Sequence, residues 1–296
     1  MVIFETIIYN QHKNFRKSKL YKTLRRMNID IKYKKKLYNK NIKVVFKWLV
    51  NEDNPNIPEE ILNNNQIRII NKNFVTQDKI NLEKYHIESF GYGLNIDPTK
   101  FNGYAFRKGR SHKYKRLNNV GKPKGEGEGN LMLKEHSINE KPKIVKEKKG
   151  LIRYMIVKCP IKKYDINSVY QKVINFKSND NKYFREYRIA IINGKIFIIL
   201  DLYKNGIEDG VGNCPKVLHI RPSIFFNNKE KWKSSILKYI KLIGLEYGDI
   251  DVLIDSEDKL YIIDVNNAPM GEPKSPQYYQ SVWSEYTKEI STMLQI

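Results

Sequence analysis

The feature that most constrains the fold is a strand-turn-strand pattern near the C-terminus, over residues 247–269. Two runs rich in β-branched residues flank a short polar turn, and apolar and polar residues alternate along each run. In a β-strand, every second side chain points to the same face. The sequence therefore predicts an antiparallel hairpin in which each strand presents one set of side chains to a common face.

The turn decides which residues of the two strands lie opposite each other. We place its tip between Glu257 and Asp258, and counting outward from there puts Asp251 opposite Asp264. Asn266 lies two residues beyond Asp264 and points the same way. Two carboxylates and an amide oxygen are therefore expected to converge at the open end of the hairpin.

Such a cluster of oxygen atoms indicates a metal site. Directly opposed residues have Cβ atoms about 5 Å apart, and two carboxylates at that distance repel each other unless a cation neutralises them. Mg²⁺ is commonly held by one or two carboxylates together with substrate phosphates. The alternative is a surface hairpin with solvated acids. The third oxygen donor and the abrupt Asn-Asn-Ala-Pro end of an apolar strand favour the metal site.

An Asp on one core strand, followed by an acid-x-Asn segment that ends in a Pro turn, resembles the metal-binding end of the ATP-grasp superfamily. The resemblance implies ATP as the cofactor and two Mg²⁺ ions that bridge its phosphates, held by Asp251, Asp264 and Asn266. Most ligases of the superfamily carry Glu where this chain has Asp264. An Asp-x-Asn segment also occurs in ATP-grasp kinases of inositol phosphates, so a ligase and a kinase both stay open.

A second part of the resemblance lies before the basic middle of the chain. Residues 90–98 read Phe-Gly-Tyr-x-Leu-x-x-Asp-Pro, and a strand pattern that ends at Lys108 follows. This order is similar to one group of ATP-grasp proteins, in which a lysine at the end of the first lid strand reaches the α- and β-phosphates. The resemblance gives this role to Lys108 and makes Lys158 the second phosphate-facing lysine. Lysine suits this task because its point charge needs no fixed geometry.

The segment after the lid strands resembles the hinge whose backbone receives adenine. By that resemblance Gln171, Lys172 and Val173 line the purine edge. An ordinary core strand is the alternative, and it fits this short segment nearly as well.

A positively charged residue, Arg188, interrupts the apolar run before the hairpin signal Asn193-Gly194. Arg188 is therefore expected to face a polar site, and Glu186, which alternates with it, is expected to orient it. The resemblance implies that Arg188 holds the γ-phosphate or an acyl phosphate through a charge-assisted, forked contact. Lys204 is a further phosphate candidate.

The fold class that we expect is α+β. The resemblance implies an ATP-grasp fold, in which two α+β lobes with antiparallel sheets, the lid and the metal-binding core, sandwich ATP behind a small α/β N-terminal lobe. The boundaries we assign are residues 1–105 for the N-terminal lobe, 106–176 for the lid and 177–296 for the core. Helices are expected over 78–85 and over 229–243, the second with Asn228 as its N-cap.

The lid carries an insertion over residues 109–150, which includes a Gly/Lys/Glu-rich tract. Its glycine spacing matches neither a Walker loop nor a dinucleotide-binding fingerprint. It is either an enlarged lid over ATP or the substrate, or a solvated linker, and its position between two lid strands favours the lid.

Composition narrows the class of protein. The net charge of +22 over 296 residues attracts polyanions, although an AT-rich coding sequence would also give abundant Lys, Asn and Ile. No apolar run approaches the roughly 20 residues of a membrane helix, so we expect no membrane partner. Two cysteines fit a reducing compartment, and we expect a cytoplasmic protein. The five histidines lack metal-ligand spacing.

Three functions follow from these observations. The first is an ATP- and Mg²⁺-dependent carboxylate–amine ligase of the peptide type, which acts through an acyl phosphate on an anionic or carboxylate-bearing small molecule or a peptide. The second is a kinase of a polyol phosphate, an inositol phosphate or a sugar. The third is a basic nucleic-acid-binding protein without catalysis, which leaves the acidic hairpin unexplained and is the least favoured.

Overall fold

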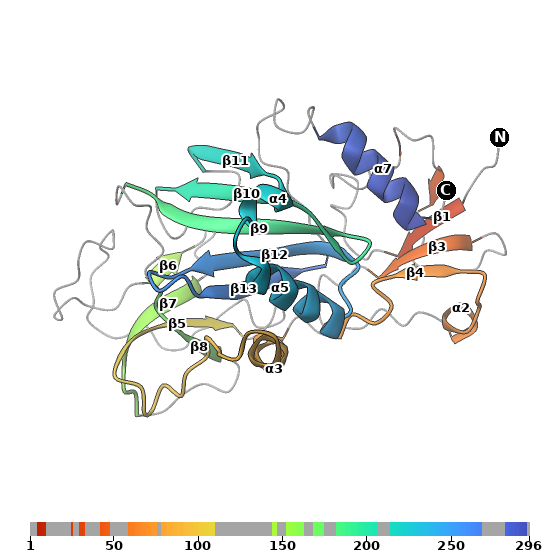
Figure 1. Ribbon diagram of the computed structural model, residues 1–296. Coiled ribbons are helices and arrows are strands. Elements are labelled where there is room, and N and C mark those ends of the chain that lie inside the picture. The colour runs from red at the N-terminus through yellow and green to blue at the C-terminus, as the bar shows by residue number, and fades with distance from the viewer. Residues whose placement is uncertain are drawn as a thin grey trace.

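The computed structural model places the chain in three β-sheets with helices packed between them (Figure 1). The structure describes residues 5–9, 25, 30–32, 42–47, 59–75, 78–109, 144–146, 152–162, 168–174, 182–205, 214–267 and 282–294. Most of the expected insertion over 109–150 lies outside these ranges, so its role as a lid or a linker stays a prediction.

The N-terminal sheet is entirely parallel, with the strand order β2-β1-β3-β4. Its elements are β1 (Glu5–Tyr9), β2 (Asp30–Lys32), β3 (Ile42–Lys47), the short helix α2 (Glu59–Leu62) and β4 (Arg68–Ile70). Val44, Ile69 and Ile70 are buried in it. Parallel neighbours need crossover connections rather than hairpins, which agrees with the small α/β lobe expected here.

The second sheet is antiparallel, with the order β6-β7-β5-β8. Its strands are β5 (Gly103–Gly109), β6 (Ile144–Lys146), β7 (Ile152–Cys159) and β8 (Ser168–Lys172). On one face, Ala105, Cys159 and Tyr170 pack against Ile96 and Phe101 from the segment before β5. The face that carries Lys108 is the other one, because side chains alternate along β5.

The third sheet is also antiparallel, with the order β11-β10-β9-β12-β13, and we call it the core sheet. Its strands are β9 (Phe184–Ile192), β10 (Lys195–Lys204), β11 (Lys216–Ile220), β12 (Tyr247–Ile254) and β13 (Leu260–Asn266). Asn193 and Gly194 both have positive φ, 53° and 68°, as a tight two-residue hairpin turn requires. The Asn-Gly hairpin signal is therefore confirmed.

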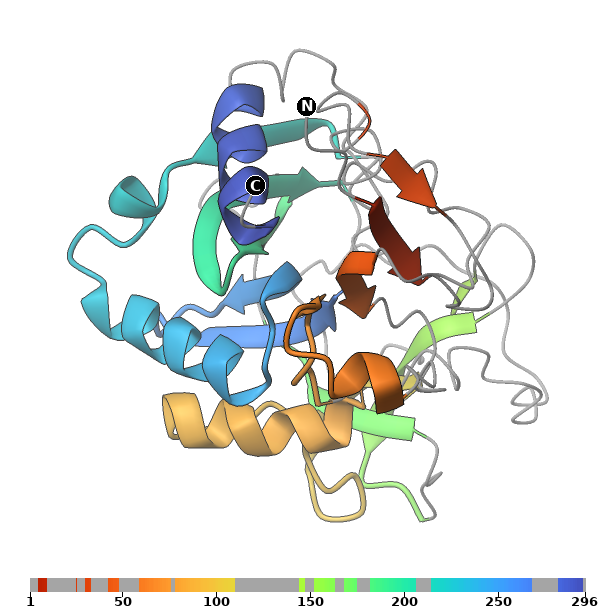
Figure 2. The same ribbon diagram turned by 90° about the vertical axis from the view of Figure 1, so that its right-hand side faces the viewer.

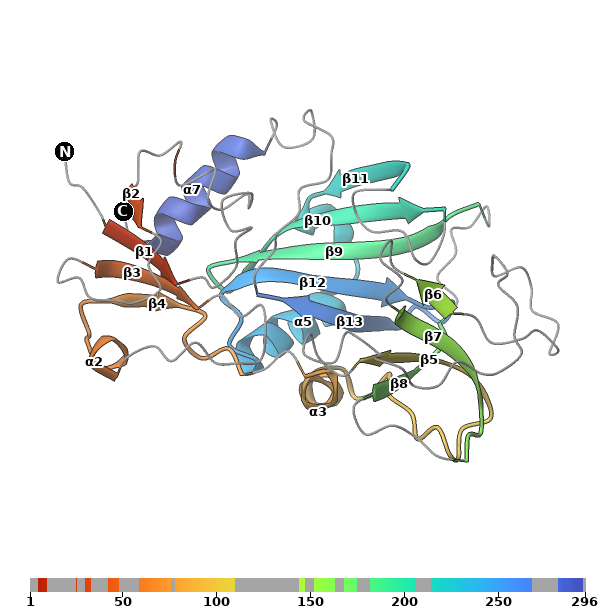
Figure 3. The same cartoon turned by 180° about the vertical axis from the view of Figure 1, so that it is seen from behind.

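Four helices accompany the last two sheets: α3 (Lys79–Phe90), α4 (Pro222–Phe225), α5 (Glu230–Leu242) and α7 (Trp283–Leu294). Helices α3 and α5 lie side by side (Figure 2). In Figure 1, α5 lies in front of the core sheet. In Figure 3, which views the molecule from behind, β6 and β7 lie in front of the same sheet. The core sheet therefore has one face against α5 and its other face, the site face, toward the second sheet.

The main apolar core lies between the core sheet and α5. Alternate residues of β9 and β12, among them Ile189 and Ile250, are fully buried there beside Ile236 of α5. This alternation leaves the intervening side chains of the same strands on the site face. Among the described helices, none combines the length and the apolar character that crossing a membrane requires.

Two helix ends differ from the expectation. Helix α3 continues to Phe90 because Asp78 caps its first turn and Gly91, with φ of 80°, ends it. Helix α5 has Lys229 at its N-cap position without a side-chain cap, and Asn228 has φ of 59°. The expected Asn228 cap is therefore wrong.

The β12–β13 hairpin confirms the pairing expected at its open end. Asp251 lies directly opposite Asp264, and Asn266 lies opposite Asp249. Since every second residue of a strand points to the same face, these four side chains share the site face. The convergence of oxygen donors that the sequence predicts is thus a property of the fold.

The register near the turn is corrected by the structure. Ile254 pairs with Leu260, so the turn is centred on Glu257 rather than between Glu257 and Asp258. A β-bulge restores the expected pairing further along, because Ile263 is an extra residue of β13 with no partner opposite it on β12. The expected pairing at the open end therefore depends on a bulge that the sequence pattern does not announce.

Candidate active site

A row of charged side chains crosses the site face of the core sheet. It consists of three ion pairs, which join Lys204 to Glu186, Arg188 to Asp251, and Lys79 to Asp264. The first two pairs come from β9, β10 and β12, and the third joins the start of α3 to β13. We call these six residues the charged row.

Arg188 and Asp251 form a forked contact across adjacent strands. The distances are 2.6 Å from Nε to Oδ1 and 2.9 Å from Nη2 to Oδ2, and the side chains are 19% and 15% exposed. Burial disfavours the charged guanidinium, but the charge and hydrogen bonds of Asp251 outweigh this and raise the pKa of Arg188. Arg188 does face a polar site, as expected, and in the structure it holds a carboxylate.

Lys79 is the member of the charged row that the sequence reasoning missed. It opens α3 directly after the N-cap Asp78, and its Nζ lies 2.7 Å from Oδ1 of Asp264. The Lys79 side chain is mostly buried, at 13% exposure. An N-cap signal at Asp78 would have put Lys79 in a first helical turn, but no local pattern links that turn to β13.

Glu186 binds Lys204 and not Arg188, which corrects the expected orienting role. The distance from Lys204 Nζ to Glu186 Oε2 is 2.7 Å, and both side chains are almost fully buried. Burial raises the pKa of Glu186, and the charge of Lys204 acts against this shift. Lys204 therefore lies on the site face, where the carboxylate of Glu186 neutralises its charge.

Lys108 approaches this row from the second sheet. Burial first, and then the charge of Lys79, lower its pKa to about 8, while Asp264 and Glu186 act in the opposite direction. Within the described part of the chain, no carboxylate forms an ion pair with Lys108; its Nζ lies 5.6 Å from the ring centre of Phe106. Lys108 is a partly desolvated cation close to carboxylates that other cations neutralise.

Lys158 occupies the neighbouring strand of the same sheet. It lies opposite Tyr104 of β5. Tyr104 and Lys108 are an even number of residues apart on that strand, so Lys158 and Lys108 point to the same face. Lys158 is exposed. The expected pair of lid lysines is therefore on a common face, with Lys108 half-buried near the charged row and Lys158 in solvent.

The expected adenine residues lie at the end of β8. The side chain of Gln171 is buried, its Nε2 donates to Asn95 Oδ1 at 3.1 Å, and its Oε1 is buried without a hydrogen-bond partner among the described residues. The backbone N–H groups of Lys172 and Val173 already donate to protein carbonyls, at 3.0 Å and 3.3 Å. The acceptor Oε1 of Gln171 is thus the group at this edge that still requires a donor.

Gln171 and the charged row meet at one small cavity. Lys79, Gln171 and Asp264 line it together with Glu83 and His86, and its volume is about 10 Å³. This is roughly the space of one water molecule. The second sheet and the core sheet are therefore closely packed where the expected adenine and metal residues come together.

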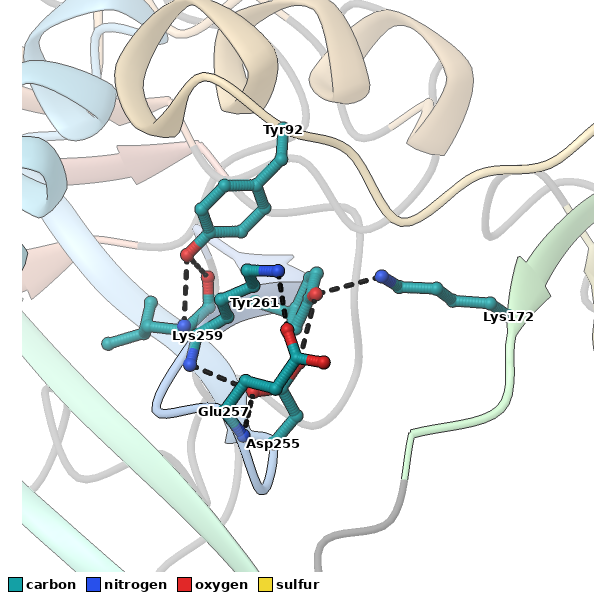
Figure 4. A network of polar contacts seen from close by, with 7 residues as sticks. Tyr92, Lys172, Asp255, Glu257, Lys259 and Tyr261 are labelled. Atoms are coloured by element: carbon teal, nitrogen blue, oxygen red, sulfur yellow. Dashed lines mark hydrogen bonds and ion pairs between the residues drawn. The ribbon is translucent and has the colours of Figure 1, made fainter.

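A polar network connects the two sheets beside this cavity (Figure 4). Lys172 Nζ donates to the Tyr261 hydroxyl at 2.8 Å and lies 4.6 Å from the centre of its ring. The Tyr261 hydroxyl in turn donates to Asp255 Oδ2 at 3.1 Å. Burial, followed by the contact with Asp255, raises the pKa of Tyr261 to about 12. The side chain of Lys172 thus fixes β8 to the core hairpin.

The open end of the hairpin is fixed by one buried residue after β4, and we call this contact the Asn71 junction. Asn71 Oδ1 accepts from the N–H groups of Glu246 and Tyr247, at 2.8 Å and 2.9 Å, and its Nδ2 donates to Tyr247 O at 2.8 Å. Asn71 N–H donates to the Glu246 carboxylate, which also binds Arg68. Asn71 adopts φ of 60° to do so.

The donor set at the open end fits Mg²⁺. The described residues contain no group of three or more His, Cys, Asp or Glu side chains that could share a metal ion. Asp251 and Asp264 supply two carboxylates on one face, so further oxygen ligands have to come from Asn266 and from phosphate. This is the composition that a Mg²⁺–nucleotide site requires.

Comparison with solved structures shows what this arrangement is similar to. An ATP-grasp ligase associated with ribosomally made, post-translationally modified peptides (RiPPs) from Chryseobacterium gregarium, in complex with ADP and a leader and core peptide, matches with a TM-score of 0.53. The match has 12% identity and covers 99% of this chain and 97% of that one. The D-alanine–D-alanine ligase of Bacillus anthracis, complexed with ATP, matches with a TM-score of 0.54, 13% identity and coverage of 100% and 96%. The chain has the ATP-grasp fold.

A third structure agrees with this fold. The macrocyclase MdnC of Microcystis aeruginosa, bound with the precursor peptide MdnA, matches with a TM-score of 0.52 at 13% identity, over 98% of this chain and 99% of that one. Searches of family profiles and of curated proteins found no match. In ATP-grasp terms the second sheet is the lid sheet, and the charged row lies on the core sheet that faces it.

Proposed function

We propose that this ATP-grasp protein is an ATP- and Mg²⁺-dependent carboxylate–amine ligase of the peptide type, which acts through an acyl phosphate. The observation that carries the proposal is the charged row with Asp251 and Asp264 side by side, opposite a lid sheet that brings Lys108 and the unsatisfied Gln171 Oε1. The chain's solved structural relatives include ligases that bind peptides, which supports a peptide or another carboxylate-bearing substrate.

Groups that lie close together in the structure would bind ATP. Gln171 Oε1 would accept from the adenine amino group, since that oxygen is buried and unsatisfied. Phosphate oxygens would be held by Lys108, Lys158, Arg188 and Lys204. Lys79 is added to these residues because it lies in the charged row. Asp251, Asp264 and Asn266 would hold Mg²⁺, which neutralises phosphate charge when bound. Two ions are part of the proposal.

The reaction requires positioning and charge neutralisation more than acid–base groups. A substrate carboxylate oxygen forms a bond to the γ-phosphorus while the bond to the β-phosphate oxygen breaks and ADP leaves. The amine nitrogen then attacks the acyl carbon, the C–O bond to phosphate breaks, and phosphate leaves. Arg188 is the residue that we assign to the transferred phosphoryl group, because its fork matches two oxygens.

Nucleotide binding at Gln171 would involve a movement of the lid sheet. The cavity that Gln171 lines has a volume of only about 10 Å³, so an adenine at Gln171 would need the lid sheet to move away from the core sheet there. Phosphates would then take Arg188 and Lys79 as their partners, while Mg²⁺ takes Asp251 and Asp264. The ion pairs thus keep the carboxylates and the cations in place until both kinds of partner arrive together.

A kinase is the second candidate, and the Asp at position 264 is the observation that favours it. ADP release should be measured with Mg²⁺·ATP and carboxylate–amine mixtures, and separately with polyol phosphates. We expect turnover that requires both carboxylate and amine. Phosphorylation of a polyol phosphate with no amine present would count against the ligase.

The site itself is tested by Mg²⁺-dependent ATP binding to the wild type and to Asp264→Ala. We expect the wild type to bind and the variant to lose binding and its ATP-induced thermal shift. Unchanged binding in Asp264→Ala would show that the site assignment is wrong. A filter-binding titration with RNA at two salt concentrations checks the least favoured function, for which we expect no specific binding.

The compartment belongs to the same proposal. The chain has two cysteines, which fits a reducing compartment such as the cytoplasm.

A further inference from the structure

The β-bulge at Ile263 decides which face of the hairpin Asp264 occupies. Between the turn and Ile262 the strands keep the register that the turn sets. That register, continued without the bulge, would put Ile263 opposite Asp251 and turn Asp264 toward the core, opposite Ile250, which is fully buried. A slip of one residue moves every following side chain to the other face. The two carboxylates therefore meet only because the bulge is present.

Side chains, in place of a further strand, bind the outer edge of β13. β13 is the last strand of the core sheet in the described part of the chain. The Tyr92 hydroxyl accepts from Leu260 N–H at 3.0 Å and donates to Leu260 O at 2.9 Å (Figure 4). His86 Nε2 accepts from Ile262 N–H at 3.2 Å. Helix α3 and the segment after it thus supply hydrogen bonds to Leu260 and Ile262, which both precede the bulge on its turn side.

His86 can make its contact in only one protonation state. Its Nδ1 lies 2.8 Å from Tyr92 O, which only accepts, so Nδ1 carries the proton and Nε2 is left as the acceptor for Ile262 N–H. Burial lowers the pKa of His86 to about 4 and keeps the ring neutral. Phe90 stacks on the ring at 4.5 Å, and Tyr261 lies parallel to it at 6.2 Å.

We propose that His86 is a positioning residue for the carboxylate of Asp264. Its Nε2 binds Ile262 N–H, which points away from β12 as Leu260 N–H does, and so fixes the backbone directly before the bulge that places Asp264 beside Asp251. His86 does not touch Asp264; it acts through the backbone of residues 262–264. The role of Asp264 as a metal ligand rests on the proposed function, whereas the bulge and its hydrogen bond belong to the protein without ligands.

Two substitutions separate the two nitrogen atoms of the ring. His86→Asn keeps a donor near the Nδ1 position, for Tyr92 O, and loses the acceptor. His86→Gln reaches the Nε2 position and keeps an acceptor for Ile262 N–H. Both variants lose the ring stacking, so a purely structural role predicts similar losses of stability and of binding in both. Tyr92→Phe is the control, because it removes the hydrogen bonds to Leu260, on the turn side of the bulge.

The readout is Mn²⁺ affinity in the presence of ADP, measured by electron paramagnetic resonance, with thermal unfolding measured in parallel. We expect His86→Asn to bind Mn²⁺ about 10–100-fold more weakly than the wild type, as is usual when a group that orients a metal ligand is lost. We expect His86→Gln to stay within about 3-fold of the wild type on the same scale, and Tyr92→Phe to match the wild type although it unfolds earlier. Equal Mn²⁺ affinity in His86→Asn and His86→Gln overturns the proposal.

A second measurement uses the wild type alone and needs no bound nucleotide. The ¹⁵N NMR spectrum of His86 should show a neutral ring with the proton on Nδ1 down to about pH 4. A proton on Nε2 at neutral pH overturns the proposal, because Ile262 N–H would then have no acceptor. If the wild type binds no Mn²⁺·ADP at all, the proposed function fails, and the NMR result still decides the bulge contact.

Discussion

Strand β9 carries two forked Arg–Asp pairs, one on each of its faces. Arg188 binds Asp251 on the site face, and Arg185 binds Asp201 on the opposite face, through Nε–Oδ1 and Nη2–Oδ2 contacts of 2.9 Å and 2.7 Å. The two arginines are an odd number of residues apart, so alternation places them on opposite faces. The pairs have the same chemistry and the same fork, and they differ in their surroundings.

Arg185 is surrounded by aromatic rings. Its guanidinium lies 5.1 Å from the ring centre of Tyr187 and 5.6 Å from that of Tyr203, and Asp201 is fully buried. The hydrogen bond to Asp201 raises the pKa of Arg185. This pair lies against the rings of Tyr187 and Tyr203, so it is suited to stabilising the fold.

The pair on the site face lies between other charges. Glu186 and Asp249 both act on the charge of Arg188, and the Lys79–Asp264 pair lies on the next strand. A phosphate can replace Asp251 as the partner of Arg188, and a cation can replace Arg188 as the partner of Asp251. A forked Arg–Asp pair can therefore exchange partners where its neighbours are charged, and it stays formed where its neighbours are aromatic.

The largest difference between the two faces is expected for the acids. Asp251→Asn removes a proposed metal ligand, so we expect Mn²⁺·ADP affinity to fall by at least about 100-fold. Asp201→Asn should bind Mn²⁺·ADP normally, as long as it is folded, and should be less stable. The measurement is a Mn²⁺ titration by electron paramagnetic resonance, and similar affinities in the two variants would remove the distinction between the faces.

The arginines give the next effect. Arg188→Met leaves Asp251 buried and unpaired, and removing one partner of such a pair costs about 3 kcal/mol. Mg²⁺ should recover part of this loss, because it can take the partner's place. Arg185→Met should lose a similar amount with no recovery. Urea unfolding with and without Mg²⁺ measures both, and a Mg²⁺ effect that is equal in the two variants contradicts the comparison.

Lys108 extends the comparison to a half-buried cation that forms no ion pair among the described residues. Its pKa is about 8 in the folded protein, against 10.5 for an ordinary lysine. The unfolded chain therefore binds more protons between these values, so wild-type stability rises with pH from about 8 to about 10.5.

We expect Lys108→Met to be more stable than the wild type by about 1–3 kcal/mol below that window. The difference should shrink as the pH rises through the window, because burial then no longer opposes a charge. Urea unfolding at a series of pH values measures it. The exposed Lys158→Met is the matched control and should show no such trend; the same trend in both variants would mean that burial of Lys108 is not its cause.

The smallest effect is expected on the aromatic side. Lys216 Nζ lies 4.6 Å from the ring centre of Tyr203, which also contacts Arg185. Lys216→Met should lose about 0.5 kcal/mol of stability and leave Mn²⁺·ADP affinity unchanged. Thermal unfolding and the Mn²⁺ titration together check this, and a loss of affinity would connect the aromatic face to the site.

The sequence predicts the metal-binding strands better than it predicts what holds them. Alternation along two apolar strands predicts that Asp251 and Asp264 share a face, and their direct pairing agrees with the prediction because the bulge offsets the misplaced centre of the turn. The turn and the bulge were not predictable, because the bulge depends on the contact of His86 with Ile262, residues far apart in the chain. Strand periodicity describes a local pattern, and a hydrogen bond from a distant helix leaves no trace in it.

The same limit explains the missed and altered roles in the charged row. Arg188 was expected to face a polar site because it interrupts an apolar run, and it does. Its partner Asp251 comes from another strand, and Lys79 comes from a helix, so neither pairing follows from sequence spacing. The assignment of Lys108, Lys158 and the adenine residues came from the resemblance alone and stays a proposal.

The Asn71 junction links the N-terminal sheet to the β12–β13 hairpin, so the two parts have to be inherited together. An exchange of β4 together with Asn71 for the matching piece of another protein would leave the amide and carbonyl of Tyr247 without their partner. Each buried polar group abandoned in this way costs about 1–3 kcal/mol, at the very base of the strand that carries Asp251. Recombination that gives this protein a new front end can therefore succeed only if the crossover point lies ahead of β4.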